Sequence, residues 1–155
     1  MENSEKYITE NDKIQIKKLI GHQKISRLAN WADEIKSDPK WRDANDWHYC
    51  TIPDGEKYDP NIGGGKAVEK VNEFIKTLKN KNSKKNEKVV ALKLLIHLIV
   101  DLHQPLHVGN GLDRGGNNVK VNWFNEPTNI HSIWDTKLIE CQKLKNLTPP
   151  TVPSL

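Results

Sequence analysis

Histidine and aspartate residues recur at helical spacing in the second half of the sequence. His97 and Asp101 are four residues apart within an apolar stretch, and His131 and Asp135 repeat this spacing further along the chain. Residues at i and i+4 lie on one face of a helix, about one turn apart. A buried carboxylate is costly unless it is paired or bound to a metal, and imidazole with carboxylate oxygen suits zinc. One such pair is often only hydrogen-bonded, but two pairs with His107 nearby predict a metal site.

Two weaker candidates lie upstream of these pairs. Asp33 comes at the end of a predicted helix, and His48 stands between Trp47 and Tyr49. The aromatic neighbours indicate that His48 points into the protein. Neither residue identifies a site by itself.

Composition limits the classes of protein that the chain can belong to. The sequence has 155 residues, 35% hydrophobic residues, five Trp and a formal net charge of +4. This length supports one domain with a real core, and the mild positive charge permits a polyanionic partner without requiring one. The longest apolar run, 89–100, is interrupted by Lys93 and His97 and is too short to span a bilayer. The lysine-rich stretch 76–88 is typical of a solvated loop or helix end.

Two cysteines, Cys50 and Cys141, are too few for a disulfide scaffold or a cysteine zinc site, and the sequence leaves open whether they pair. The first twelve residues are polar and contain no secretory signal. The chain is therefore either intracellular or a mature or truncated form of an exported protein.

Hydrophobic periodicity predicts a mainly α-helical fold with a small β-hairpin. The segment 37–58 has no sustained period and contains several turn residues, so it is predicted as a loop, and Ser83 is a plausible N-cap. The helix that carries His97 and Asp101 is apolar nearly all round and should be central and buried. The expected elements are helices over 14–31, 67–78, 87–104 and 130–144 and a strand over 119–123.

Five segments match the pattern of a known family in order and in spacing. The sequence resembles the S1/P1 nuclease family of zinc-dependent single-strand nucleases, within the phospholipase C/P1 nuclease superfamily. The resemblance extends from about Trp31 to Glu140. It rests on WADEIK at 31–36, WHYCTIPDG at 47–55, HLIVDLHQPLH at 97–107, DRGGN at 113–117 and TNIHSIWD at 128–135.

The resemblance implies which residues bind metal. In the family a third zinc shares the equivalent of Asp101 and takes its other ligands from an N-terminal Trp and a nearby His. This sequence lacks that segment, and His22 is too close to Asp33 to replace the family His. We therefore expect two zinc ions from this chain, one held by Asp33, His48, His97 and Asp101 and the other by His107, His131 and Asp135.

The resemblance also implies a fold, an activity and a location. We expect a helical bundle of the phospholipase C/P1 nuclease type and an endonuclease that cleaves single-stranded DNA or RNA to 5′-phosphate nucleotides, with 3′-nucleotidase activity. Asp101 and Lys36 are the expected catalytic residues, and Tyr49, next to His48, is a candidate for stacking on a nucleobase. An exposed lysine at 36 and core packing of Tyr49 remain alternatives, and His103 is interpreted as a supporting or packing residue. The family implies a secreted or periplasmic monomer that acts on nucleic acid and not at a membrane.

The expected domain organisation is a flexible start over 1–12, a partial catalytic domain over 13–145 and a Pro-rich tail over 146–155. Relative to the family pattern, the sequence looks like the central part of a nuclease without its N-terminal segment and C-terminal helices.

Two other functions stay open. One is a phospholipase C-like lipid phosphodiesterase, although the polar, Lys- and Asn-rich sequence favours nucleic acid. The other is an inactive zinc-binding fragment.

Overall fold

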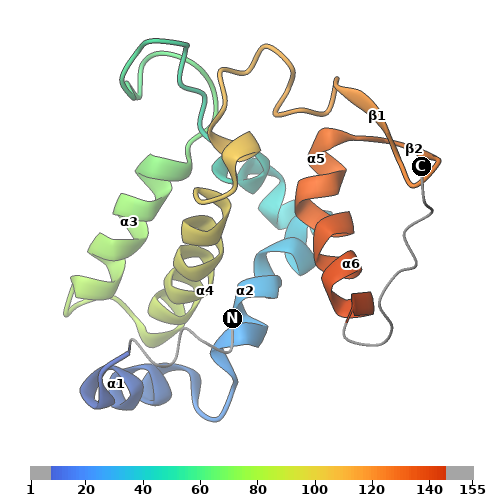
Figure 1. Cartoon of the computed structure of the whole chain (residues 1–155). Helices are drawn as coiled ribbons and strands as arrows, with labels where there is room; N and C mark the ends of the chain where they lie inside the picture. The colour runs from blue at the N-terminus through green and yellow to red at the C-terminus, as the bar shows by residue number, and fades with distance from the viewer. Residues whose placement is uncertain (1–7, 146–155) are drawn as a thin grey trace.

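The computed structural model describes residues 8–145 and shows a mainly α-helical fold with one two-stranded antiparallel sheet, which confirms the predicted fold class (Figure 1). Within the described range, no helix has the length and apolar character needed to cross a membrane. The helices are α1 (Glu10–Ile20), α2 (Ile25–Glu34), α3 (Ala67–Lys79), α4 (Lys85–Asp101), α5 (Ile130–Ser132) and α6 (Leu138–Lys145), and the strands are β1 (Lys120–Trp123) and β2 (Glu126–Asn129). Short 3₁₀ segments cover Ile35–Ser37, Pro39–Trp47 and Pro105–Val108.

Helix α4 is the centre of the fold, with α2 and α3 packed on either side of it (Figure 1). Its buried Ala91, Leu94 and Leu98 contact Val71 and Phe74 of α3 in the hydrophobic core. This arrangement agrees with the prediction of a central helix, although α4 ends at Asp101 and its last turn exposes part of its apolar surface. The polar residues of α4 that face inward are therefore held by a packed helix, whose side chains have little freedom.

A row of aromatic rings fixes the segment that precedes His48. Trp31 and Trp41 meet edge to face with ring centroids 5.4 Å apart, and Trp41 meets Trp47 in the same way at 6.4 Å. Trp47 then packs on Phe74 of α3 at 5.9 Å. Such contacts bury large apolar surfaces in defined geometries. They explain why Pro39–Trp47 forms helical turns, whereas the sequence predicted a loop there.

The predicted helix over 14–31 is two helices, because Gly21 adopts a left-handed φ of 67° and ends α1. Helix α1 starts at Glu10 behind a capping box, in which Thr9 and Asp12 each accept a hydrogen bond from the other's backbone N–H. This start lies inside the segment expected to be flexible, whereas residues 1–7 fall outside the described range. The N-cap of α4 is Lys84 rather than the predicted Ser83.

The C-terminal part begins with the predicted strand, which pairs with β2 in a hairpin from Lys120↔Asn129 to Trp123↔Glu126. Phe124 and Asn125 turn the chain with positive φ values, as two-residue hairpin turns require. The single helix predicted over 130–144 is divided by a π-helical turn at Ile133–Lys137 between α5 and α6. The predicted tail over 146–155 lies outside the described residues.

Candidate metal centre

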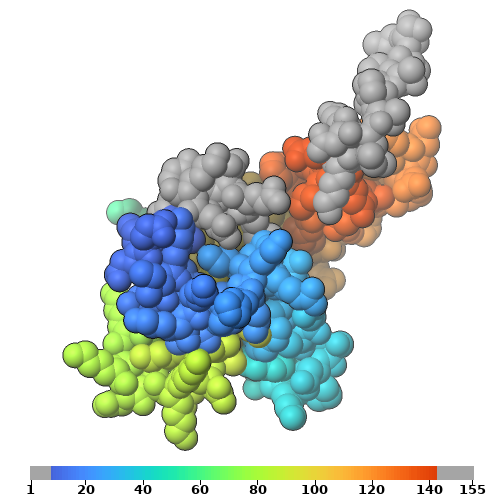
Figure 2. Space-filling model, turned by 90° about the horizontal axis from the view of Figure 1, so that it is seen from below, coloured from blue at the N-terminus to red at the C-terminus, as the bar shows by residue number. Residues whose placement is uncertain are grey.

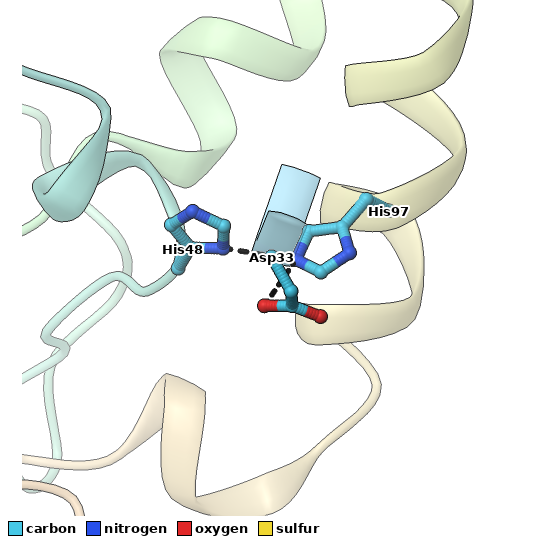
Figure 3. A group of neighbouring side chains, drawn as sticks. All are labelled: Asp33, His48 and His97. Atoms are coloured by element: carbon cyan, nitrogen blue, oxygen red, sulfur yellow. Dashed lines mark hydrogen bonds and ion pairs between the residues drawn. The ribbon is translucent and has the colours of Figure 1, made fainter. Parts of the chain in front are cut away.

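The first candidate metal group joins residues from three elements. Asp33 lies near the end of α2, His48 follows the 3₁₀ segment, and His97 lies on α4. One ligand-type atom from each residue lies within 4.8 Å of the others, and the three side chains converge on one point (Figure 3). Both histidines are buried, whereas Asp33 is exposed. The group can therefore offer two imidazoles from the protein interior and one carboxylate from the solvent side.

A backbone hydrogen bond orients His97. Its Nδ1 donates to the carbonyl oxygen of Ala29 in α2 at 2.7 Å. In the neutral ring, Nε2 then presents its lone pair toward the group, 3.0 Å from His48 Nδ1 and 3.8 Å from Asp33 Oδ1. A second ring nitrogen bonded to a carbonyl is the usual way in which proteins fix a metal-binding histidine.

The second candidate group joins the 3₁₀ segment Pro105–Val108, helix α5 and the π-helical turn. His107, His131 and Asp135 place one ligand-type atom each within 4.8 Å of the others. His131 Nε2 lies 2.9 Å from Asp135 Oδ2, and its Nδ1 donates to the carbonyl oxygen of Gly115 at 2.7 Å. This histidine is therefore held in the same way as His97. A Cβ on Gly115 would approach the Leu106 carbonyl oxygen to 2.7 Å, so only glycine allows this close passage.

Asp101 lies between the two groups and contacts both. Its Oδ2 accepts a hydrogen bond from His48 Nδ1 at 2.8 Å and lies 3.0 Å from His97 Nε2. Its Oδ1 lies 3.4 Å from His107 Nδ1. Asp101 is thus a candidate shared ligand between the two groups.

The charges of this centre depend on one another. Burial by itself would raise the pKa of Asp101, but its interactions with the imidazoles of His107, His48 and His97 hold that pKa well below its usual range. Burial lowers the pKa of His107, but Asp101 and Asp135 outweigh that effect and raise it to about 9. In the absence of a cation, positively charged imidazole is therefore stabilised by the two carboxylates.

The residues present fit a bound divalent cation. Each group supplies three nitrogen or oxygen ligands, the number of protein ligands typical of catalytic zinc sites. His107 Nδ1 is buried and has no hydrogen-bond partner within the described part of the chain, which is costly for a polar atom. A cation would compensate the carboxylates without requiring the imidazoles to be protonated.

Both groups border one cleft of about 460 Å³. Lys36 and Tyr49, which the sequence singled out, line this cleft. Tyr49 is 40% exposed, so the alternative that it only packs in the core is wrong. Lys36 places Nζ 2.6 Å from Asp33 Oδ1, at an exposed ion pair that leaves the lysine at the cleft edge. The cleft thus combines candidate metal ligands, a cation and an aromatic ring.

Comparison with known proteins identifies the family. The S1/P1 Nuclease model matches residues 4–150. The chain belongs to the S1/P1 nuclease family. It is similar to Endonuclease 3 of Arabidopsis thaliana, with 32% identity over 149 residues, 88% of this chain and 51% of that protein. It is similar to Nuclease S1 of Aspergillus oryzae, with 33% identity over 132 residues, 79% of this chain and 45% of that protein.

Nuclease P1 of Penicillium citrinum is a more distant relative, with 26% identity over 121 residues, 72% of this chain and 44% of that protein. This S1/P1 family chain spans about half the length of the curated relatives it matches. Two His/Asp groups that could hold metal ions thus lie in a chain of the S1/P1 nuclease family.

Sequence reasoning did not single out three polar residues at this centre. Gln104 donates through Nε2 to Asp135 Oδ1 at 2.7 Å and accepts from the Leu106 N–H through Oε1. Arg114 and Asn117 line the cleft. All three lie inside or beside the HLIVDLHQPLH and DRGGN motifs, which is the only signal that could have pointed to them.

Two other histidines lie outside the centre. His22 is exposed and belongs to neither group, as expected. His103 is exposed, and its Nδ1 donates to the Ile99 carbonyl oxygen of its own helical turn at 2.6 Å. Its predicted supporting role is not visible in any contact with the candidate ligands. Cys50 is buried and Cys141 half-buried, and both are free.

Proposed function

We propose that this chain is a zinc-dependent phosphodiesterase that cleaves single-stranded DNA or RNA to 5′-phosphate nucleotides and also removes 3′-phosphates from nucleotides. One observation carries the proposal: two His/Asp groups, joined by Asp101, border the same cleft. Membership of the S1/P1 nuclease family supports it. The same membership supports a monomer in a secreted or periplasmic location.

The proposed ligand sets are those of the sequence analysis. Zinc in such a site supplies Lewis-acid chemistry at phosphoryl oxygens and lowers the pKa of a bound water. The chain itself fixes the distance between the two groups through Asp101, which contacts histidines of both. The ligand sets are Asp33, His48, His97 and Asp101 for one ion and His107, His131 and Asp135 for the other.

Two residues at the cleft edge are proposed to bind substrate. Lys36 lies beside Asp33, where its ammonium can neutralise a phosphate oxygen as the strand enters. Tyr49 adjoins His48 and exposes its ring to the cleft, where a splayed nucleobase can stack on it. A base in a duplex must first leave its stack, so this geometry favours single strands.

The test is hydrolysis of five substrates by the zinc-loaded chain, with metal content measured on the same sample. We expect cleavage of single-stranded DNA and RNA oligonucleotides and release of phosphate from 3′-AMP, little cleavage of duplex DNA and none of phosphatidylcholine. EDTA should abolish the activity and zinc should restore it. His103→Ala, a histidine change outside the centre, should behave as the unmodified chain.

Two results would contradict the proposal. Preferential hydrolysis of phosphatidylcholine would identify a lipid phosphodiesterase. Two bound zinc ions without hydrolysis of any of these substrates would identify an inactive zinc-binding protein.

A further inference from the structure

Positive charge is concentrated at the turn between α3 and α4. Residues 76–88 contain six lysines and one glutamate, a formal charge of +5, whereas the whole chain carries +4. The rest of the chain is therefore close to neutral, at −1. The basic turn, as we call it, consists of Lys76, Lys79, Lys81, Lys84, Lys85 and Lys88.

The lysines of the basic turn are available to a partner. Five of them are exposed, and Lys88 is half-buried. Within residues 8–145, none of the six ammonium groups forms an ion pair. Other lysines of the fold, such as Lys66 and Lys70, are paired with acidic residues at 2.7 Å. Within the described residues, the basic turn thus gathers six lysines without an ion pair in a stretch of thirteen residues.

Helix stability explains only part of this charge. Lys76 and Lys79 lie in the last turn of α3, where cations interact favourably with the helix dipole. Lys84, Lys85 and Lys88 lie at the start of α4, where cations are unfavourable. Neutral or acidic residues at these three positions would stabilise the helix more. The same holds for Lys81, whose ammonium group is repelled by the neighbouring lysines. Local conflicts of this kind are expected at functional sites.

The surface beside the basic turn is concave. A groove of about 460 Å³ separates α3 from the start of α4. Phe74, Val90 and Ala91 form its apolar part, and Thr77, Ser83, Asn86 and Glu87 contribute hydroxyl, amide and carboxylate groups. Seen from below, the chain near residue 80 projects beside α1 on this face (Figure 2). The lysines of the basic turn are therefore neighbours in sequence of residues that line a groove with polar groups for hydrogen bonding.

We propose that the basic turn binds the phosphate backbone of single-stranded nucleic acid as a second contact, remote from the metal centre. The proposal rests on the proposed function only for the choice of nucleic acid as the polyanion. Within 76–88 no large apolar side chain is exposed, so the surface lacks the apolar residues that insert into a membrane. Lysine contacts to phosphates release counterions and need no particular base sequence.

The distance between the two contacts sets a length requirement. Helix α4 runs from Lys85 at the basic turn to Asp101 at the metal centre. At 1.5 Å per residue, this separation is about 24 Å. At about 3.4 Å per stacked nucleotide, about seven nucleotides span it. A dinucleotide that occupies the metal cleft therefore cannot reach the basic turn, whereas a strand of 20 nucleotides can.

The test compares two variants of equal charge. Lys81→Gln with Lys85→Gln removes two cations from the basic turn, and Lys40→Gln with Lys57→Gln removes two exposed cations elsewhere. Binding of a 20-nucleotide oligo-dT is measured by fluorescence anisotropy over a series of salt concentrations in EDTA, after circular dichroism has confirmed equal helix content. EDTA prevents hydrolysis, so the result does not depend on nuclease activity.

We expect the basic-turn variant to bind the 20-mer at least fivefold more weakly, with a salt slope smaller by about 1.4. The control variant should change either value much less, and both variants should bind a dinucleotide as the unmodified chain does. Equal losses in the two variants, or no loss in the basic-turn variant, would overturn the proposal. Weaker binding to phosphatidylserine vesicles but not to oligo-dT would overturn it in favour of a membrane contact. If binding depends on the basic turn but no zinc-loaded sample cleaves nucleic acid, the proposed function fails while the second contact stands.

Discussion

The two candidate metal groups are built in different ways. Asp33, His48 and His97 come from elements that are distant in the sequence and meet only because α2, the Trp-rich turns and α4 pack together. His107 and His131 lie on a 3₁₀ turn and a one-turn helix within a single stretch of the chain. The side chain of His97 is 8% exposed, whereas that of His131 is 23% exposed. The two histidines of the first group are therefore buried within the fold while its Asp33 is exposed, and the second group is part of a loop region.

The two groups also differ in the contacts that hold their histidines in place. His97 is fixed by a carbonyl of a neighbouring core helix, so its position depends on core packing. His131 is fixed by the carbonyl of Gly115 in a glycine-rich loop. Loops have fewer packed neighbours and open more easily than cores. We therefore expect the first group to be preformed and the second to gain order from the metal. Asp101 touches both and couples them.

The largest effect is expected at Asp101. Asp101→Ala leaves three imidazoles without their shared carboxylate, so we expect loss of zinc from the first group and an activity loss of at least about 100-fold. Asp101→Asn keeps the shape and should weaken zinc binding less. Zinc per chain by elemental analysis and initial rates on single-stranded DNA measure both effects. Full zinc content in Asp101→Ala would show that it is not a ligand.

Substituting one histidine in each group tests directly whether the two groups differ in how they are embedded in the fold. His97→Ala and His131→Ala should each reduce the zinc content from two ions to one. Only His97→Ala should also lower the stability of the metal-free chain, by about 2–3 kcal/mol, because it opens a buried site. Thermal unfolding in EDTA measures this difference. Equal destabilisation by both changes would show that the two groups are equally embedded in the fold.

Zinc affinity should rise with pH. In the metal-free chain the carboxylates raise the pKa of His107 to about 9, so its ring is protonated at pH 7. Zinc binds neutral imidazole and therefore releases this proton, which strengthens binding by up to about tenfold per pH unit between 7 and 9.

The stability of the metal-free chain, in contrast, should fall as the pH rises. The raised pKa of His107 adds stability that is complete below about 6.5, the usual histidine value, and is lost as pH rises through about 9. For the zinc prediction, calorimetric titrations of zinc into the chain, in buffers of different ionisation enthalpy, count the protons that zinc binding releases. Identical zinc affinity at pH 7 and 9 would contradict the assignment.

The smallest effect is expected at Gln104, which sharpens the comparison because it serves only the second group. Its side chain holds Asp135 and caps the 3₁₀ turn that carries His107. Gln104→Ala should weaken zinc binding at the second group by about 10-fold and leave the first unchanged. Gln142→Ala, at an exposed position of α6, is the matched control. Loss of zinc from both groups would mean that Gln104 acts through the fold as a whole.

Local patterns in the sequence predicted several parts of the structure. The i, i+4 spacing placed His97 and Asp101 together, and likewise His131 and Asp135, because a helix brings such positions to one face. The apolar run predicted α4 as the central helix, and alternation predicted β1. The positions at which helices are interrupted were less predictable. Gly21 divides a helix through its left-handed φ, and the π turn at Asp135 interrupts another without changing the apolar pattern.

The sequence alone determined the residue types of the centre and, through motif order, the family. Tertiary structure decided which of them meet. Asp33 and His48 reach His97 because the edge-to-face Trp rings fix the intervening turns, and no local spacing encodes such a contact. The position of Asp101 between two groups likewise depends on where the chain turns back after α4. Helical periodicity acts over a few residues, whereas a metal centre of this kind requires long-range packing that only the folded chain provides.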